Sequence, residues 1–150
     1  MITLEPMTDA RFATWSAGMW TSYREEVMRA GMSEAAADEN IAQNKAVTMP
    51  DGVLASGQHI FDVLHDGTAI GAVWLAERIN EWFIYDIEID PEFRGEGFGR
   101  EAMRRIEEYV RSHGGMSIGL SVFGFNHVAQ RLYASEGYET TRISMQKRLV

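Results

Sequence analysis

The feature that most constrains the fold is a glycine-rich loop between a strand-like and a helix-like segment. Residues 81–90 are rich in aromatic and β-branched side chains, and Pro91 ends this strand because proline cannot donate to a sheet ladder. The loop Arg94–Arg100 follows, and apolar residues then recur at helical spacing over residues 99–110. The segment 116–123 has the apolar character of a buried strand. Strand, helix and strand predict a right-handed crossover between parallel strands.

The rest of the chain predicts an α/β fold in one domain spanning residues 1–150, with a mixed sheet and helices on both of its faces. In the first helix, Trp15, Met19 and Tyr23 form the expected core stripe, and Trp20 falls off it. The expected elements are strand 2–5, helix 9–31, helix 34–47, a hairpin of strands 59–65 and 68–76, helix 126–137 and a last strand at 138–149.

Composition excludes several classes of protein and site. Without cysteine the chain has no disulfide, no thiolate metal ligand and no acyl-cysteine intermediate, and it fits a reducing, cytoplasmic location. No two histidines are spaced i, i+4, so we expect no metal site of the helical zinc type. The net charge of −8 argues against nucleic acid as a partner. The longest apolar run, residues 69–76, is too short for a membrane span, and the first residues have no basic region typical of a signal peptide.

The charge is unevenly distributed along the chain. Residues 1–57, 58–97 and 98–150 carry net charges of −4, −7 and +3. This asymmetry suggests a molecule that meets a cation on one side and an anion on the other. Chance variation on a solvated surface is the alternative interpretation.

The glycine-rich loop has the chemistry of a phosphate site. Its glycines let a ligand approach closely to unpaired backbone amides at a helix N-terminus, where the helix dipole is positive. A Walker loop needs Gly-Lys-Ser/Thr, but Arg100 and Glu101 follow Gly99 here. A dinucleotide fingerprint needs Gly-x-Gly-x-x-Gly and an acidic residue about 20 positions later, and neither is present.

At this loop the sequence resembles the GNAT superfamily of acyl-CoA-dependent N-acyltransferases, whose pyrophosphate motif is Arg/Gln-x-x-Gly-x-Gly/Ala. Arg94, Gly97 and Gly99 match it, and the preceding family pattern of an apolar-x-apolar strand followed by x-Pro matches residues 87–91. Three further family signals follow in order at Asn126, Leu132-Tyr133 and Gly137-Tyr138. The long paired helices before this region are similar to those of a poorly characterised bacterial subgroup of the family.

The resemblance implies a GNAT-like fold in which strands 82–90 and 116–123 splay apart and leave a cleft for acetyl-CoA, the co-substrate. The pantetheine amides would then pair with the strand backbone, the loop would hold the pyrophosphate, and the basic last third, including Arg104 and Arg131, would suit the phosphates. The implied coenzyme-binding residues are Ile87, Ile89, Arg94, Gly95, Glu96, Gly97, Phe98, Gly99, Arg100 and Asn126.

The resemblance also suggests how the reaction is catalysed. Tyr133 would protonate the departing thiolate, since a hydroxyl with a pKa of about 10 can assist a thiol with a pKa of about 8.5. Glu88 is the best candidate for the base that deprotonates the amine, with Asp86 on the same strand face. The alternatives are structural: Asn126 as a helix N-cap, Tyr133 as a core aromatic and Glu88 as a hydrogen-bond acceptor.

The expected activity is transfer of an acetyl group to a primary amine of a small molecule or peptide, by direct attack in a ternary complex. A cationic acceptor would suit the acidic middle of the chain. The rival hypothesis is an acyl-CoA-binding sensor or interaction module without catalysis. No residue identifies the acceptor, and the sequence leaves the oligomeric state open, a homodimer included.

Overall fold

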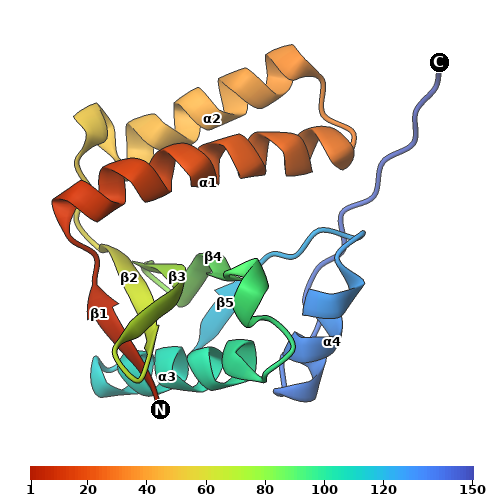
Figure 1. Cartoon of the computed structure of the whole chain (residues 1–150). Helices are drawn as coiled ribbons and strands as arrows, with labels where there is room; N and C mark the ends of the chain where they lie inside the picture. The colour runs from red at the N-terminus through yellow and green to blue at the C-terminus, as the bar shows by residue number, and fades with distance from the viewer.

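The computed structural model describes residues 1–150 as one five-stranded sheet with helices on both faces (Figure 1). The strand order is β1-β2-β3-β4-β5, antiparallel throughout except for the parallel pair β4–β5. The elements are β1 Ile2–Pro6, α1 Asp9–Arg29, α2 Glu34–Thr48, η1 Pro50–Gly52, β2 Gln58–His65, β3 Thr68–Glu77, β4 Trp82–Ile89, η2 Pro91–Phe93, α3 Phe98–Ser112, β5 Ile118–Leu120 and α4 His127–Ser135.

Helices α1 and α2 cover one face of the sheet. They begin where the sequence predicts, because the hydroxyl groups of Thr8 and Ser33 accept hydrogen bonds from amides in the first helical turns. The interpretation of Trp20 as lying off the core stripe is wrong. Trp20 is 8% exposed and its ring packs edge-on against Trp74 of β3, with 5.8 Å between centroids. Trp20 therefore belongs to the small core between the two helices and the sheet, which also contains Ile41, Met49, Ile60 and Trp74.

Helix α3 covers the other face and makes the larger core. Ala102, Met103, Ile106 and Val110 are at most 3% exposed, so the predicted helical stripe is confirmed. They pack against sheet residues that alternate with those facing α1, such as Val73 and Leu75 of β3.

Strands β3 and β4 approach closely at Gly71. A Cβ atom at this position would overlap the carbonyl oxygen of Glu88, so no residue other than glycine fits without moving β4. Further along, the register shifts between Trp74 and Leu75, which leaves Tyr85 as an extra residue in β4. Beyond this bulge, Asp86 lies opposite Trp74 and Glu88 lies opposite Ala72. Their side chains therefore lie on the sheet face that α1 covers, as Trp74 does.

The last part of the chain differs from the sequence prediction. The strand expected at residues 138–149 does not form, and the expected strand at 116–123 is reduced to β5. After α4 the chain continues as an exposed tail that runs away from the sheet to the C-terminus (Figure 1). An alternating pattern becomes a strand only where a neighbouring strand completes its hydrogen bonds, and none lies beyond β5. No residue after Val110 is buried.

None of the helices combines the length and the apolar composition needed to cross a bilayer.

Candidate active site

The parallel strands β4 and β5 separate after a short contact. They pair only between Trp82–Ile84 and Ile118–Leu120, whereas β4 continues to Ile89. The predicted splaying is therefore confirmed, and the edge of β4 that faces away from β3 has no strand partner over residues 85–89.

The peptide groups of Ile87 and Ile89 point to this open edge. The amide of Asp90 donates to the carbonyl of Ile70 in β3 at 2.8 Å, so the peptide groups of the even-numbered residues here face β3. Those of the odd-numbered residues face away, and the Ile89 carbonyl accepts instead from Nε of Arg94, also at 2.8 Å. Two residues assigned to the pantetheine arm thus offer backbone groups to a ligand that adds like a strand.

The loop before α3 presents a row of unpaired amides. The amides of Gly95, Glu96 and Gly97 make no hydrogen bond, and the first helical bond joins the amide of Glu101 to the carbonyl of Gly97. The amides of residues 98–100 are therefore also free. Gly97 has φ of +80°, and a Cβ atom built on it meets no atom within 4 Å, so open space lies beside the loop. The loop has the geometry of an anion site.

Arg94, the first residue of the motif, is held at the end of β4. Besides its bond to Ile89, it pairs with Glu88 through Nη2 at 2.9 Å, and both side chains are about half exposed. Because an exposed ion pair is weak, the guanidinium can exchange this carboxylate for a phosphate at little cost. Arg94, which is predicted to bind the anion, thus contacts Glu88, which is predicted to act as the general base.

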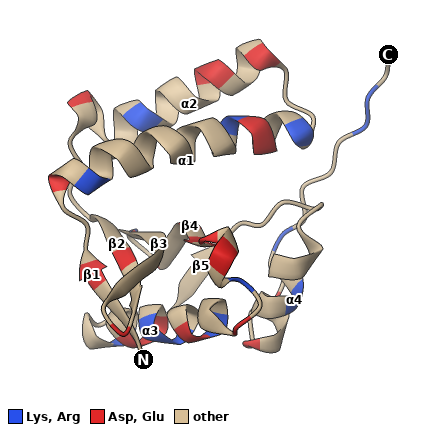
Figure 2. Ribbon diagram, in the orientation of Figure 1, with Lys and Arg blue, Asp and Glu red and all other residues tan.

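Three carboxylates gather where β4 passes beneath the end of α1. Asp86 is partly buried, and its burial, reinforced by the charges of Glu88 and Glu26, raises its pKa to about 7. Burial, followed by the charge of Glu88, also raises the pKa of Glu26. Figure 2 shows the acidic positions along β4 and on the last turns of α1. The same-face placement of Asp86 and Glu88 was predictable from strand alternation, whereas the approach of Glu26 was not.

Tyr133 lies on the other side of the cleft, on α4. It is partly buried against the core that α3 forms, and burial, with a smaller effect from the charge of Asp86, raises its pKa. The phenol therefore stays protonated at neutral pH and can donate a proton. Asn126 caps the same helix by accepting from the amide of Ala129 at 3.2 Å, so its structural role is present whatever else it binds.

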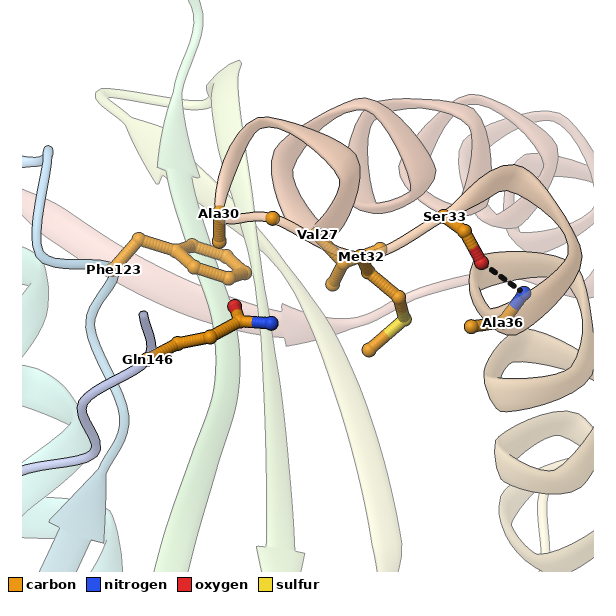
Figure 3. Close-up of a pocket in the computed structure, with 8 residues that line it drawn as sticks. Val27, Ala30, Met32, Ser33, Ala36, Phe123 and Gln146 are labelled. Carbon is orange, nitrogen blue, oxygen red and sulfur yellow. Dashed lines mark hydrogen bonds between the residues drawn. The ribbon is translucent and has the colours of Figure 1, made fainter. Parts of the chain in front are cut away.

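A cavity that sequence reasoning missed opens at the corner between α1 and α2. It has a volume of about 470 Å³, and Figure 3 shows Phe123 and Gln146 facing Val27, Ala30 and Met32 across it. Its two sides lie about 100 residues apart in the sequence, so no local pattern indicates it. No group of three histidine or acidic residues is arranged to hold a metal ion.

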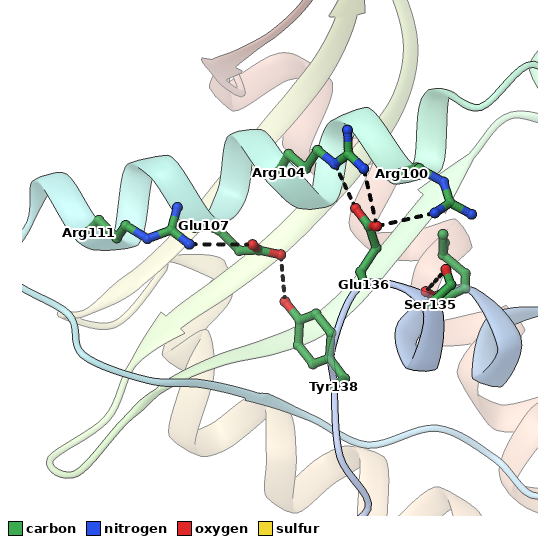
Figure 4. Close-up of polar contacts among 8 residues, drawn as sticks. Arg100, Arg104, Glu107, Arg111, Ser135, Glu136 and Tyr138 are labelled. Carbon is green, nitrogen blue, oxygen red and sulfur yellow. Dashed lines mark hydrogen bonds and ion pairs between the residues drawn. The ribbon is translucent and has the colours of Figure 1, made fainter.

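A cluster of charged residues joins α3 to the end of α4. Glu136, whose side chain is 8% exposed, accepts from Nε of Arg104 at 2.7 Å and from Nη1 of Arg100 at 3.2 Å (Figure 4). The hydrogen bond from Arg104 lowers the pKa of Glu136. A carboxylate thus holds both arginine side chains, which were expected near the coenzyme phosphates. Arg100 contributes its backbone amide, not its side chain, to the row of free amides in the loop.

Comparison with known proteins agrees with this geometry. The model of the acetyltransferase (GNAT) family matches residues 14–138. The uncharacterized N-acetyltransferase YdgE of Bacillus subtilis strain 168 is 30% identical over 98% of both chains, and YycN of the same strain is 28% identical over 99% of both. The crystal structure of YycN superimposes with a TM-score of 0.90 over 100% of this chain and 99% of the other.

The PaiA N-acetyltransferase of Thermoplasma acidophilum, solved in complex with coenzyme A, shares the fold. Its TM-score is 0.64 at 17% identity, over 96% of this chain and 93% of that one. The family match and the two Bacillus subtilis relatives confirm the expected enzyme class, an acyltransferase, and the YycN structure confirms the expected fold. The chain belongs to the GNAT family of acetyltransferases.

Proposed function

We propose that this chain transfers an acetyl group from acetyl-CoA to a primary amine of a small molecule or peptide, by direct attack in a ternary complex, within one domain spanning residues 1–150. The main observation behind the proposal is that two binding features follow each other directly along the chain. The open edge of β4 leads directly into the row of free amides between Gly95 and Arg100. A ligand with an amide-containing arm and a pyrophosphate matches that order of groups.

In this proposal Ile87 and Ile89 bind the pantetheine amides, and the loop amides with Arg94 bind the pyrophosphate. Arg94 must release Glu88 or the Ile89 carbonyl for this to happen, which the exposure of the ion pair allows. The PaiA structure supports the assignment, because that protein holds coenzyme A on the same fold. The bound thioester supplies the activated acetyl group, and the chain orients it.

Two observations favour Asp86 as the base, rather than the Glu88 that the sequence suggested. Asp86 is the more buried carboxylate and has a pKa of about 7, the value at which a base is both available and strong at neutral pH. Glu88 is exposed and paired with Arg94. Asp86 would take a proton from the ammonium form of the acceptor, directly or through one water.

Tyr133 is the proposed acid. Its protonated phenol would donate to the sulfur as the carbon–sulfur bond breaks, and Asp86, close enough to affect its pKa, would accept on the amine side. The two groups lie on α4 and β4, so the reacting atoms would sit between the two walls of the cleft. Since the chain has no cysteine, no acyl-cysteine intermediate competes with direct attack.

The acceptor we propose is a primary amine with a second positive charge. Glu26, Asp86 and Glu88 together would attract such a molecule, and the cavity at the α1–α2 corner offers room for its remainder. The aminoglycoside acetyltransferase AAC(6')-Iy, solved with a bisubstrate analogue, shares this fold at 16% identity.

The test is release of free thiol from acetyl-CoA in the presence of a panel of amines. If the chain is an enzyme, at least one amine should cause thiol release, and little thiol should be released without amine. The matched control is the double variant Asp86→Asn/Tyr133→Phe, which should be inactive. A chain that is stabilised by acetyl-CoA, with a higher Tm, but releases no thiol with any amine would support the sensor hypothesis instead.

A further inference from the structure

An arginine that the proposed reaction does not use lies over β4, close to the candidate base. Arg78, in the turn between β3 and β4, places Cζ of its guanidinium 3.7 Å from the ring centroid of Phe83 and 5.0 Å from that of Tyr85. Its Nη2 donates to the hydroxyl of Tyr85 at 2.9 Å. Two rings and a hydrogen bond thus hold this cation in one position, although Arg78 is exposed.

The charge of Arg78 has no carboxylate partner. Arg94, at the other end of β4, binds the side chain of Glu88, whereas Arg78 makes no ion pair. The neighbouring Glu81 turns toward β5, where its carboxylate oxygens lie 2.9 Å from the position that a Cβ atom on Gly119 would take. The guanidinium therefore keeps most of its N–H donors for a ligand, in the fork geometry that fits a carboxylate.

Arg78 and the candidate base share one face of the sheet. The neighbours of Phe83 in β4 belong to the core against α3, so Phe83 points to the face that α1 covers. On that face the ring of Tyr85 packs against Trp74 with 4.7 Å between centroids, and Tyr85 is still 37% exposed. Asp86 lies opposite Trp74 in the strand register. One molecule on this face can therefore contact both Asp86 and Arg78.

The next step rests on the proposed function, because it places the acceptor by the path of the coenzyme. An arm that pairs with the open edge of β4 runs from residue 89 toward residue 85, with the pyrophosphate in the loop behind it. It cannot continue along β4, because β5 occupies that edge over Trp82–Ile84. The thioester would therefore leave the edge beside Tyr85 and Asp86. The acceptor has to meet it there, within reach of Arg78.

We propose that Arg78, held by Phe83 and Tyr85, binds a carboxylate of the acceptor while Asp86 binds its reacting amine. The acceptor would then be an amino acid. The acidic residues of the proposed acceptor site attract a second amine as well, so the class that fits best is a diamino acid. Arg78 orients this molecule and takes no part in proton transfer.

The first test compares acceptors that differ only in the carboxylate. Lysine and lysinamide both carry two amines, and ornithine and its amide repeat the comparison with a shorter chain. Thiol release from acetyl-CoA should give a kcat/KM about 10-fold or more higher for the acid than for the amide in at least one pair. Calorimetric titration into the protein with bound CoA measures affinity without turnover and should show the same preference. Equal kcat/KM, or equal affinity, within both pairs would overturn the inference.

The second test assigns the carboxylate to Arg78. Arg78→Gln removes the cation and should abolish the preference by raising KM for the acid, with KM for the amide unchanged. Arg105→Gln is the matched control, since it removes the same charge from an exposed ion pair on α3 and should leave the preference intact. Tyr85→Phe removes only the hydroxyl that holds Arg78 and should weaken the preference less. An equal loss with acid and amide in Arg78→Gln would mean that Arg78 only braces the turn.

The two measurements separate this inference from the proposed transfer reaction. If no amine causes thiol release, the transfer is refuted, whereas tighter binding of the acids and its loss in Arg78→Gln would still support the carboxylate site. If thiol is released with equal kcat/KM for acid and amide, the transfer is supported and the carboxylate site is refuted.

Discussion

The two walls of the cleft differ in how they are held. One wall is β4, the glycine loop and α3, and it rests on a core in which Ala102, Met103 and Ile106 have no exposed surface. The other is β5, α4 and the tail, where no residue is buried. The first wall is therefore preformed, whereas the second is fixed mainly by polar contacts at the end of α4, such as those of Glu136 with Arg100 and Arg104.

This difference matches the chemistry expected of each wall. An anion site of backbone amides works only if the amides are fixed before the ligand arrives, since ordering them would reduce affinity. The proposed acid, Tyr133, needs its final position only once the coenzyme is bound. Weakly packed segments are also the ones that can open to let a ligand in and a product out. Binding is thus assigned to the preformed wall and proton donation to the weakly held one.

The largest expected effect is on catalysis at the weakly held wall. Tyr133→Phe keeps the ring and its packing but removes the proton, so kcat should fall by about 100-fold or more with little change in coenzyme affinity. Steady-state kinetics and calorimetric titration with CoA measure the two quantities.

Tyr138→Phe is the matched control, because its ring lies 5.9 Å from that of Tyr133 while its hydroxyl donates to Glu107. It should leave kcat within a few-fold of wild type. An equal loss in both variants would mean that packing, not proton donation, explains the effect.

The next effect concerns the preformed wall. Gly97→Val fills the open space beside the loop amides and should weaken CoA binding by about 10- to 100-fold. The measurement is the Kd for CoA. Part of any loss could come from backbone strain, because Gly97 has a left-handed φ of +80°.

Gly114→Val controls for this strain. Gly114 lies just beyond the other end of α3, has φ of +79° and has equally open surroundings. Both variants should lose similar stability, and only the first should lose affinity. Equal affinities would place the phosphate site away from the loop.

The sequence was sufficient for the preformed wall because its signals are local. Helical spacing identified Ala102, Met103 and Ile106 as core, and the loop glycines indicated free amides. The weakly held wall depends on partners distant in sequence. Strand alternation at Ile143 and Met145 indicates a strand but not which edge it joins, and nothing local reveals that Glu136 binds Arg100 and Arg104. The expected coenzyme residues stay predictions on both walls.

A third prediction concerns stability and the pKa of Asp86. This carboxyl has a pKa of about 7 in the folded protein and about 3.8 when unfolded, so the folded state binds the proton more tightly. Its contribution to stability is therefore complete below about pH 3.8 and declines as the pH rises through 7. Asp86→Asn should stabilise the protein by roughly 1 to 3 kcal/mol at pH 8, and by less at pH 5.

Thermal unfolding at the two pH values measures this difference. Glu92→Gln is the control, since this exposed carboxylate does not contribute to the raised pKa of Asp86 and should give a small effect at both. The same Asp86 variant should lose the rise of kcat/KM with pH near 7. Retention of that rise would assign the base to another group.

The smallest expected effect tests whether the acidic residues beside the preformed wall select the acceptor. A diamine should exceed a neutral-tailed monoamine of equal length in kcat/KM by several-fold at low salt, because Glu26, Asp86 and Glu88 attract its second charge. The advantage should shrink at about 0.15 M salt, where exposed charges farther apart than about 8 Å are screened. Some of it should persist, since Asp86 is partly buried and therefore less screened. No advantage at low salt would mean that these carboxylates serve proton transfer alone, and that the cavity at the α1–α2 corner selects the acceptor by shape.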